Sequence, residues 1–416
     1  MADLRSVVDA VFRQESGRII AGLIRVSGSF DLAEEAMQDA FAAALAHWPG
    51  KGIPDNPAAW ITAAAHRKLI DYARRSRTRR DKAEELLRET QIAGIEEDPL
   101  ADSAAMTFPD DRLRLIFTCC HPALNAEAQV ALTLRTLGGL TTPEIAHAFL
   151  VTESTLAQRL VRAKRKIQVA RIPYETPPKE LLPERLDSAR SVIYLIFNEG
   201  YKASAGDSLI RRELCSEAIR LGRTLSDLLP GEPESVGLLA LMLLHDSRRN
   251  ARVNDRGELI PLEEQRRSQW DKDQIREGLN LVEEALRLRQ AGPYQLQAAI
   301  AAVHASAPAA LDTDWKQIAM LYRELECAFP SAIVALNRAV AVAMSDGLET
   351  GLKQIEELTE LSEYYLYHAA RADILRRLGR AQDAVDAYRC ALGLTANASE
   401  RRYMRRRLRE LGAPET

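Results

Sequence analysis

The residues best suited to contact a nucleic acid lie in the segment from Leu140 to Ile167. Within it, apolar residues recur at the spacing i, i+4, i+7 and i+11, which predicts one buried stripe of a helix. They are Leu156, Leu160, Ala163 and Ile167. The side chains left outside this stripe are hydrogen-bonding groups and cations: Ser154, Thr155, Gln158, Arg159, Arg162 and Arg165. Arg and Gln can bond base edges and cations can neutralise phosphates, so this face could read DNA.

A preceding helix is needed to hold that face in position. Thr141 and Glu144 flank Pro143 and predict a capped helix that ends near Phe149, and Thr152 is a natural N-cap for the next helix. Two helices joined by such a short connection form a helix-turn-helix. Leu150 stands in the turn where Gly is usual, which predicts a slightly remodelled turn. The alternative is an amphipathic helix whose arginines only face water.

Two other groups of residues could do chemistry. Cys119–His121 could suggest a metal site, but adjacent residues on a helix diverge by about 100°, and no second ligand cluster completes a tetrahedral set, so packing is favoured. An enzyme could use His245, Asp246, Ser247, Arg248 and Arg249 with Glu199 or Asp314. Adjacent His, Asp and Ser side chains do not converge on one helix face, and no Gly-rich phosphate loop accompanies them. We therefore expect no catalytic site, no metal and no cofactor.

Charge is unevenly distributed along the chain. The 416 residues have a formal net charge of −3, so any affinity for nucleic acid must come from local clusters. Basic residues gather in 66–82 and 158–171, whereas 84–111 holds nine acidic residues against one Arg. No apolar run approaches the roughly 20 residues of a membrane span, and the N-terminus does not resemble a signal peptide. We expect a cytoplasmic protein with no membrane contact and, with five cysteines, no disulfide framework.

Nearly every segment with a clear period predicts a helix, so the expected fold class is all-α. In residues 31–48 an apolar stripe opposes a purely acidic side formed by Asp31, Glu34, Glu35 and Asp39. A segment with three prolines and two glycines, 48–60, interrupts this pattern, and the following helix is expected to run from Pro57 to the arginines near 75. Four prolines in 172–184 mark the main domain boundary.

The C-terminal half predicts stacked helix pairs. In 367–394, six positions have the small and aromatic residues of a helix-turn-helix repeat about 34 residues long: Ala372, Gly379, Ala384, Tyr388, Ala391 and Leu392. The repeat weakens upstream and dissolves between about 187 and 295. The polar segments near 245–271 fit either buried ion pairs or a site for a peptide, a partner protein or a small-molecule signal, because helical repeats favour concave binding surfaces.

Taken together, these segments resemble bacterial sigma factors of the extracytoplasmic-function (ECF) group within the sigma-70 family. "DLAEEAMQDAFAAAL" and "WITAAAHRKLIDYARR" resemble two helices of region 2, and "LTTPEIAHAFLVTESTLAQRLVRAKRKI" resembles region 4. "DDRLRLIFTCCHPAL", "LLALMLLHDSRRNAR" and "ALNRAVAVA" resemble the subgroup with a C-terminal tetratricopeptide-like extension. The expected domains are region 2 at 8–80, an acidic linker at 81–110, region 4 at 111–171, a Pro-rich linker at 172–186 and the helical extension at 187–416.

The resemblance implies a dissociable subunit that gives core RNA polymerase its promoter specificity and has no catalytic site. The outer residues of the predicted helix-turn-helix, Ser154 to Arg165, would contact the minus-35 element of promoter DNA, and the four acidic residues would dock on the clamp helices of the polymerase's largest subunit. The minus-10 contacts would come from Arg67, Lys68, Arg74, Arg75 and Arg77, and the loop from Trp48 to Asn56 would receive an unstacked base. The extension would regulate activity. The alternative is a helix-turn-helix repressor or activator with a helical sensor domain.

Overall fold

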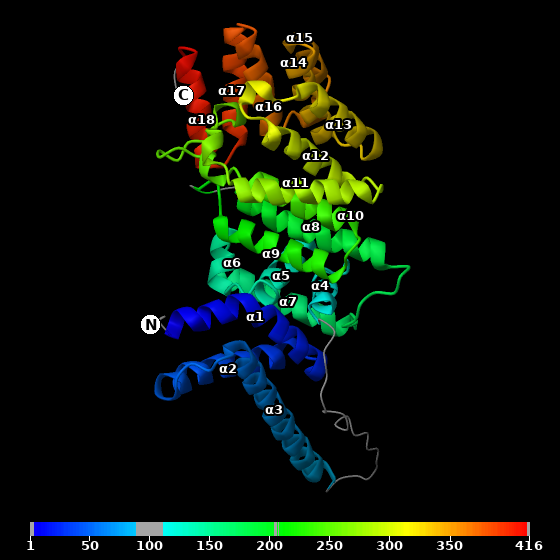
Figure 1. The fold of residues 1–416 in the computed structure, drawn as a ribbon. Helices are drawn as coiled ribbons and strands as arrows, with labels where there is room; N and C mark the ends of the chain where they lie inside the picture. Colours follow the sequence, from blue (N-terminus) through cyan, green and yellow to red (C-terminus); the bar gives the residue numbers. More distant parts are fainter. Residues whose placement is uncertain (1–3, 89–110, 204–205, 207, 414–416) are drawn as a thin grey trace. The chain divides into compact units, whose positions relative to one another are not determined.

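The computed structural model describes residues 4–88, 111–203, 206 and 208–413 (Figure 1). It describes their side chains too, except those of Arg5, Arg13 and residues 73–88. Helices dominate this part of the chain, which contains no strand and only two isolated β-bridges. The predicted all-α fold class is confirmed. Most of the predicted acidic linker, 89–110, lies outside the described residues.

The chain divides into two compact units. The first unit comprises Met1–His147 and Val151–Val192, and the second comprises Ala148–Leu150 and Ile193–Thr416. The division falls within helix α8 (Leu182–Tyr201), beyond the Pro-rich segment 172–186. This segment is part of the first unit, because the Tyr174 hydroxyl donates to the carbonyl of Ala21 at 2.8 Å and the Ile172 side chain is buried.

Helix α1 joins two groups of helices within the first unit. It packs against α2 and α3 and also against α4 and α5. The buried Asp111 side chain reinforces this junction, because it accepts from Arg25 and from Arg114, each at 2.9 Å. The helices are α1 (Leu4–Ser27), α2 (Phe30–Lys51), α3 (Pro57–Arg88), α4 (Arg112–Cys119), α5 (Ala126–Thr136), α6 (Thr142–Ala148) and α7 (Glu153–Val169).

The break after α2 is shorter than the sequence predicts. Helix α2 continues through Pro49 to Lys51 and ends at Gly52, whose φ of 83° suits a residue without a Cβ. Trp48 therefore lies in the helix and not in a loop, so that part of the expected base-binding loop is wrong. The reason is burial: the Trp48 indole is 3% exposed and packs edge-on against Trp60, with ring centroids 5.5 Å apart. Helix α3 in turn extends to Arg88, past the expected end near 75.

The second unit is built from consecutive helices that pack mainly on their chain neighbours. Helix α10 packs on α9, α11 and α12, and the pairs α13–α14, α16–α17 and α17–α18 follow (Figure 1). The helices are α9 (Arg212–Leu228), α10 (Pro233–Asp246), α11 (Lys272–Arg287), α12 (Pro293–Ser306), α13 (Trp315–Ala328), α14 (Ala332–Ser345), α15 (Leu348–Glu356), α16 (Tyr365–Arg377), α17 (Ala381–Leu394) and α18 (Ala398–Glu410). Such nearest-neighbour packing is typical of helical solenoids.

The last helical hairpin has the small residues that the repeat pattern singled out. Gly379 turns the chain between α16 and α17 with a φ of 76°. Ala372, Ala384 and Ala391 are fully buried, so the two helices can approach closely around Tyr388, which is also fully buried. The assignment of this unit to a tetratricopeptide-like family stays a prediction.

Across the described residues, no helix is both long enough and apolar enough to span a bilayer.

Candidate nucleic-acid interface

Helices α6 and α7 form the predicted helix-turn-helix. A capping box starts α6: the Thr141 amide donates to the Glu144 carboxylate at 2.7 Å, and the Glu144 amide donates back to the Thr141 hydroxyl at 3.4 Å. Thr152 caps α7 by accepting from the amide of Thr155 at 3.1 Å. The predicted stripe of α7 is buried: Leu156, Leu160, Ala163 and Ile167. Local sequence signals therefore account for both helix starts and for the inward face.

The turn between these helices keeps the backbone conformation that usually calls for Gly. Leu150 has a φ of 51°, in the left-handed region, so the expected remodelling of the turn is wrong. Leu150 is 52% exposed, and the Val151 amide bonds to the carbonyl of Ala146 at 3.0 Å. Leu150 therefore adopts the left-handed conformation at a cost in free energy that Gly would not incur.

Replacing Leu150 with Gly should stabilise the turn by about 0.5–1 kcal/mol. The left-handed conformation costs a residue with a Cβ about 1–2 kcal/mol, and the greater freedom of Gly in the unfolded chain removes about 0.5–1 kcal/mol of that gain. Native-state hydrogen exchange of the α6 and α7 amides in the full chain measures the change. As a control, Val161→Gly removes an exposed side chain inside α7 and should speed exchange. Equal or faster exchange in Leu150→Gly would contradict the expectation.

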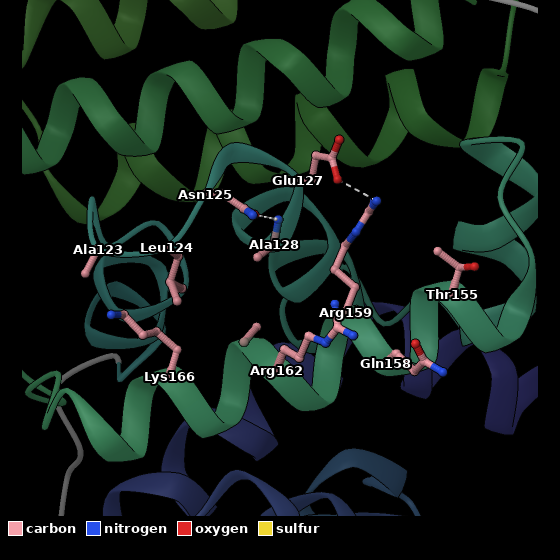
Figure 2. A pocket seen from close by; sticks show the side chains of 11 residues that line it. Ala123, Leu124, Asn125, Glu127, Ala128, Thr155, Gln158, Arg159, Arg162 and Lys166 are labelled. Carbon is pink, nitrogen blue, oxygen red and sulfur yellow. Dashed lines mark hydrogen bonds and ion pairs between the residues drawn. The ribbon is translucent and has the colours of Figure 1, made fainter.

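The outer face of α7 borders a groove of about 460 Å³ (Figure 2). The start of α5, around residues 123–128, forms its other side. Thr155, Gln158 and Arg162 line the groove and are exposed, whereas Ser154 and Arg165 are exposed but do not line it. An exposed amide beside a groove can donate one hydrogen bond and accept another, and an exposed guanidinium can donate two, as base readout requires.

Arg159 differs from the other predicted contact residues. Its guanidinium lies 2.5 Å from the carboxylate of Glu127 on α5, and its side chain is only 23% exposed (Figure 2). This ion pair holds Arg159 against α5. The pair must break, or the Arg159 side chain must rotate, before Arg159 can contact a phosphate or a base. By contrast, Gln158, Arg162 and Arg165 meet no carboxylate within the described residues.

Lys164 is an important residue that sequence reasoning missed. It lies on the flank of α7 and contacts two carboxylates of α2, Asp31 at 3.0 Å and Glu34 at 2.8 Å. The Lys164 and Glu34 side chains are 15% and 16% exposed, so this is a partly buried contact. The sequence held one signal: α2 has acidic residues and no cation between Arg25 and Lys51, so a basic partner must come from elsewhere.

The four predicted docking acids thus have three different environments. Asp31 and Glu34 contact Lys164 of α7, Glu35 is exposed, and Asp39 faces α3. Asp39 lies 3.5 Å from Lys68 and accepts from the Tyr72 hydroxyl at 2.8 Å. This hydrogen bond, with burial as a smaller cause, raises the pKa of Tyr72 to about 12. The acidic side is therefore not one continuous face open to solvent.

The predicted minus-10 cations lie along α3. Arg67 is exposed and its Nε donates to the carbonyl of Ala63 at 3.2 Å, while Lys68 pairs with Asp39. Arg74, Arg75 and Arg77 belong to the same helix, but their side chains lie outside the described residues. The structure therefore places two of these five side chains.

The other chemistry-bearing groups have structural partners. Burial raises the pKa of the Cys120 thiol to about 12, and this thiol lies 3.6 Å from the Thr133 hydroxyl. Asp246 accepts from Gln274 at 3.0 Å and pairs with Arg249, and the Asp314 carboxylate caps α13. Glu199 lies 2.5 Å from Arg211. No group of three His, Cys, Asp or Glu residues in the described part of the chain could hold a metal ion.

Three segments of the chain match known families. Residues 11–80 match Sigma-70 region 2, and residues 114–167 match Sigma-70, region 4. Residues 185–286 match a family of unknown function, DUF6596. The helix-turn-helix and the acidic side of α2 thus lie in two matched segments, and the second unit begins near the third.

Two relatives extend the comparison. The chain is 44% identical over 408 residues to the uncharacterized protein R00370 of Rhizobium meliloti (strain 1021), and this match covers 98% of the chain and 96% of that protein. It is 25% identical over 177 residues to the probable ECF RNA polymerase sigma factor SigI of Mycobacterium tuberculosis (strain ATCC 25618 / H37Rv), which covers 42% of the chain and 58% of that protein. The first match spans both units, and the second spans less than half of the chain.

Proposed function

We propose that this chain, in which two segments match Sigma-70 region 2 and Sigma-70, region 4, is an ECF-type sigma factor. It would bind core RNA polymerase and direct initiation at specific promoters. The observation that carries this proposal is the presence of region 2 and region 4 in one chain. A repressor or activator needs a helix-turn-helix but no region 2, so that alternative leaves residues 11–80 without a role.

Two faces of the first unit would contact promoter DNA. Gln158, Arg162 and Arg165 on α7 would read or hold the minus-35 element, with Ser154 and Thr155 at the N-terminal turn and Arg159 once released from Glu127. Arg67 and Lys68 on α3 would hold the minus-10 element together with Arg74, Arg75 and Arg77. Support comes from the exposure of the α7 residues beside a groove and from the concentration of cations on α3.

The acidic residues of α2 would dock on core polymerase in competition with the chain's own α7. Asp31 and Glu34 already contact Lys164, so polymerase would have to displace this lysine. We propose that the compact first unit is a resting form and that docking separates α2 from α7. Separation would also free α7 to reach a distant promoter element.

The second unit would regulate this activity. Support comes from its size, Ile193–Thr416 with the short piece Ala148–Leu150, and from its solenoid-like packing, an arrangement that favours concave binding surfaces. Its partner would be a protein, a peptide or a small-molecule signal.

Two assays with purified proteins test the proposed function. The chain should bind core polymerase in the absence of DNA, and the complex should produce runoff transcripts from a subset of a randomised promoter library. A repressor or activator would bind DNA but would do neither. If the chain fails to bind core polymerase and yet binds DNA with sequence preference, the proposal is wrong.

Replacing Arg162 with Ala should cost about 1–3 kcal/mol of promoter binding and relax the preference at one base position, because a bidentate contact to a base would be lost. Selection of bound promoters from the library, with and without the substitution, measures both effects. Arg287→Ala, a similarly exposed arginine on α11, is the control and should change neither. Unchanged base preference combined with lost core binding would contradict the assignment of Arg162.

A further inference from the structure

We infer that the second unit binds a compact monocarboxylate with an apolar or aromatic body, in a pocket lined by Arg267, His304 and Trp315. The pocket lies within this unit, where helices α12, α13, α14, α16 and α18 meet the segment 261–267. Binding itself does not depend on the proposed function. Only the role of the ligand as a signal for transcription rests on it.

The body of the ligand is set by the walls of the pocket. Val340, Met344 and Ile374 provide aliphatic surface, and Trp315 provides an aromatic wall. The Trp315 ring is fixed edge-on to the His304 ring, with centroids 5.2 Å apart and an interplanar angle of 78°. The volume is about 260 Å³, just below the range of about 300–1,000 Å³ that suits drug-sized ligands. A single ring or a short aliphatic chain fits this space.

The charge of the ligand is set by Arg267. Its guanidinium donates to the carbonyl of His304 and to the Thr313 hydroxyl at 3.4 Å, and it stacks over the Trp270 ring at 4.4 Å. Among the described residues, Arg267 makes no ion pair with a carboxylate, although the charge of Asp312 acts on it from farther away, and its Nε is buried without a hydrogen-bond partner. A cation held by neutral groups at the edge of an apolar pocket is suited to a carboxylate, which can accept two parallel hydrogen bonds.

His304 adds a second polar atom at the same place. Its Nδ1 is buried without a hydrogen-bond partner in the described part of the chain. Burial, with the charges of Arg248 and Arg267 as smaller causes, lowers the pKa of His304 to about 4. The ring is therefore neutral at pH 7 and can donate one hydrogen bond without adding charge. Leaving two such groups unpaired costs free energy that a carboxylate would recover.

The remaining charges in the pocket favour one negative charge over two. Arg377 also lines the pocket, but it is held between Glu263 and Asp373, which line it as well. These charges compensate one another, so Arg267 is the cation lining the pocket that has no carboxylate in an ion pair with it. A phosphate dianion would face the two carboxylates, so its binding is disfavoured.

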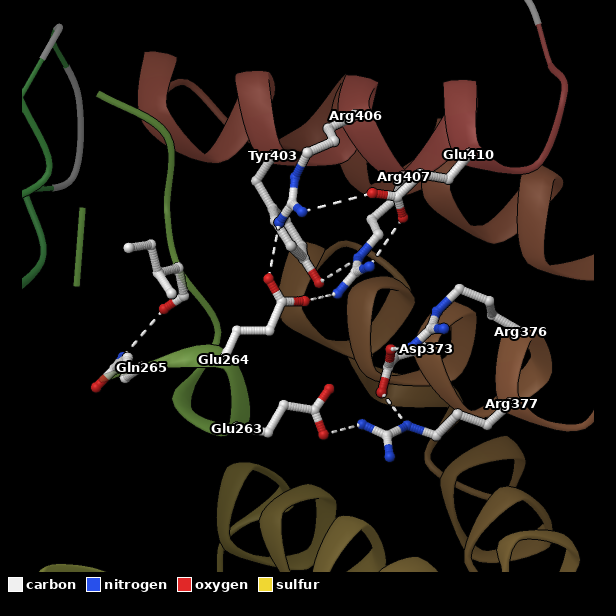
Figure 3. A network of polar contacts seen from close by, with 11 residues as sticks. Glu263, Glu264, Gln265, Asp373, Arg376, Arg377, Tyr403, Arg406, Arg407 and Glu410 are labelled. Atoms are coloured by element: carbon white, nitrogen blue, oxygen red, sulfur yellow. Dashed lines mark hydrogen bonds and ion pairs between the residues drawn. The ribbon is translucent and has the colours of Figure 1, made fainter. Parts of the chain in front are cut away.

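One wall of the pocket is formed by residues 261–263, which belong to a strap, residues 261–264, that ion pairs hold in place (Figure 3). Glu263 pairs with Arg377 of α16, and Glu264 pairs with Arg406 at 3.2 Å and with Arg407, both of α18. The strap thus links the pocket to the last helix of the solenoid. A ligand that packs against Pro261 and Leu262 would hold the strap in place. Because the strap is ion-paired to α18, binding would also stabilise α18.

Binding is tested on the full chain with phenylacetate, indole-3-acetate and hexanoate, followed by calorimetry and by tryptophan fluorescence. Phenylacetamide, which lacks the charge, and inorganic phosphate are the comparison ligands. At least one carboxylate should saturate the protein, and phenylacetamide should bind at least about 10-fold more weakly than phenylacetate, as expected for loss of a charged hydrogen bond. The inference is wrong if no carboxylate saturates at low millimolar concentration, or if the amide or phosphate binds equally well.

Two variants test the pocket at different lining residues. Arg267→Met should weaken carboxylate binding at least about 10-fold, whereas Arg266→Met, its exposed neighbour, should bind as the wild type does. Ala370→Phe adds a ring to the pocket while Arg267 is retained, and it should also abolish binding. Circular dichroism verifies that each variant is folded. Wild-type binding by either folded pocket variant would overturn the site.

Runoff transcription with core polymerase distinguishes binding of the ligand from its role as a signal. A change in transcript yield on adding the carboxylate, absent in Arg267→Met, supports the ligand as a signal. Binding without any change in yield leaves the site in place but removes its role as a signal. Failure of the chain to bind core polymerase would instead remove the proposed function.

Discussion

Reversing Asp31, Glu34 and Asp39 to Lys is expected to weaken binding to core polymerase by on the order of 100-fold, because like charges would then face each other across the interface. Replacing Lys164 with Glu is expected to strengthen the same binding several-fold. Both changes abolish the contact of Lys164 with Asp31 and Glu34. Only the first also removes the acidic groups that polymerase would contact.

The two variants are expected to change the affinity for core polymerase in opposite directions, so comparing them tests the competition with α7. Lys164→Glu leaves the acidic residues in place and adds a repulsive charge beside them, so a larger fraction of molecules would offer a free docking face. Binding is measured by fluorescence anisotropy at two salt concentrations, because the salt dependence should fall in the reversed variant. The control is a reversal of three other exposed acids of the first unit, Asp9, Glu175 and Glu180, which gives the same change in net charge. If both variants weaken binding alike, the contact only stabilises the fold.

A chain that ends at Leu394, and therefore lacks α18, is expected to lose about 4 kcal/mol or more of stability in the second unit. Met404 and Leu408 are 2% and 0% exposed, and removing a buried side chain of this size costs about 2–5 kcal/mol each. Their loss would also uncover Tyr388 and Leu392 in the same core cluster.

The loss should extend to the start of the second unit. The Asn397 side chain donates to the carbonyls of Ala203 and Ser208, and Glu400 lies 3.3 Å from Lys202. Residues about 200 positions apart are thus joined just before and within α18. Hydrogen exchange should therefore accelerate at the end of α8 as well as in α17.

Controls distinguish this role from a general effect of truncation. A chain that ends at Ala413 retains α18 and should be as stable as the full chain, and Met404→Ala with Leu408→Ala should reproduce most of the loss. Amides of α2 and α7, in the first unit, should exchange as in the wild type. Unchanged exchange at α8 after removal of α18 would contradict the link through Asn397 and Glu400.

The sequence by itself determined the local features of this protein. The helix starts at Thr141 and Thr152 depend on hydrogen bonds over three residues, and the buried stripe of α7 depends on the helical period. Both signals are complete within a short segment, so the helix-turn-helix and the all-α class could be predicted. Three ordered motifs pointed to the sigma-70 family for the same reason.

The tertiary structure alone decided which faces meet. Lys164 lies more than 130 residues from Asp31, and nothing in the period of α2 distinguishes Glu34, which is covered, from Glu35, which is exposed. Arg267 is one of many arginines in the sequence, and only the packing of five helices leaves it without an ion-paired carboxylate beside a pocket with apolar walls. Trp48 likewise lies within α2 because the Trp60 indole of the next helix covers it. Such contacts depend on the summed burial of segments far apart in the chain, which local propensity does not encode.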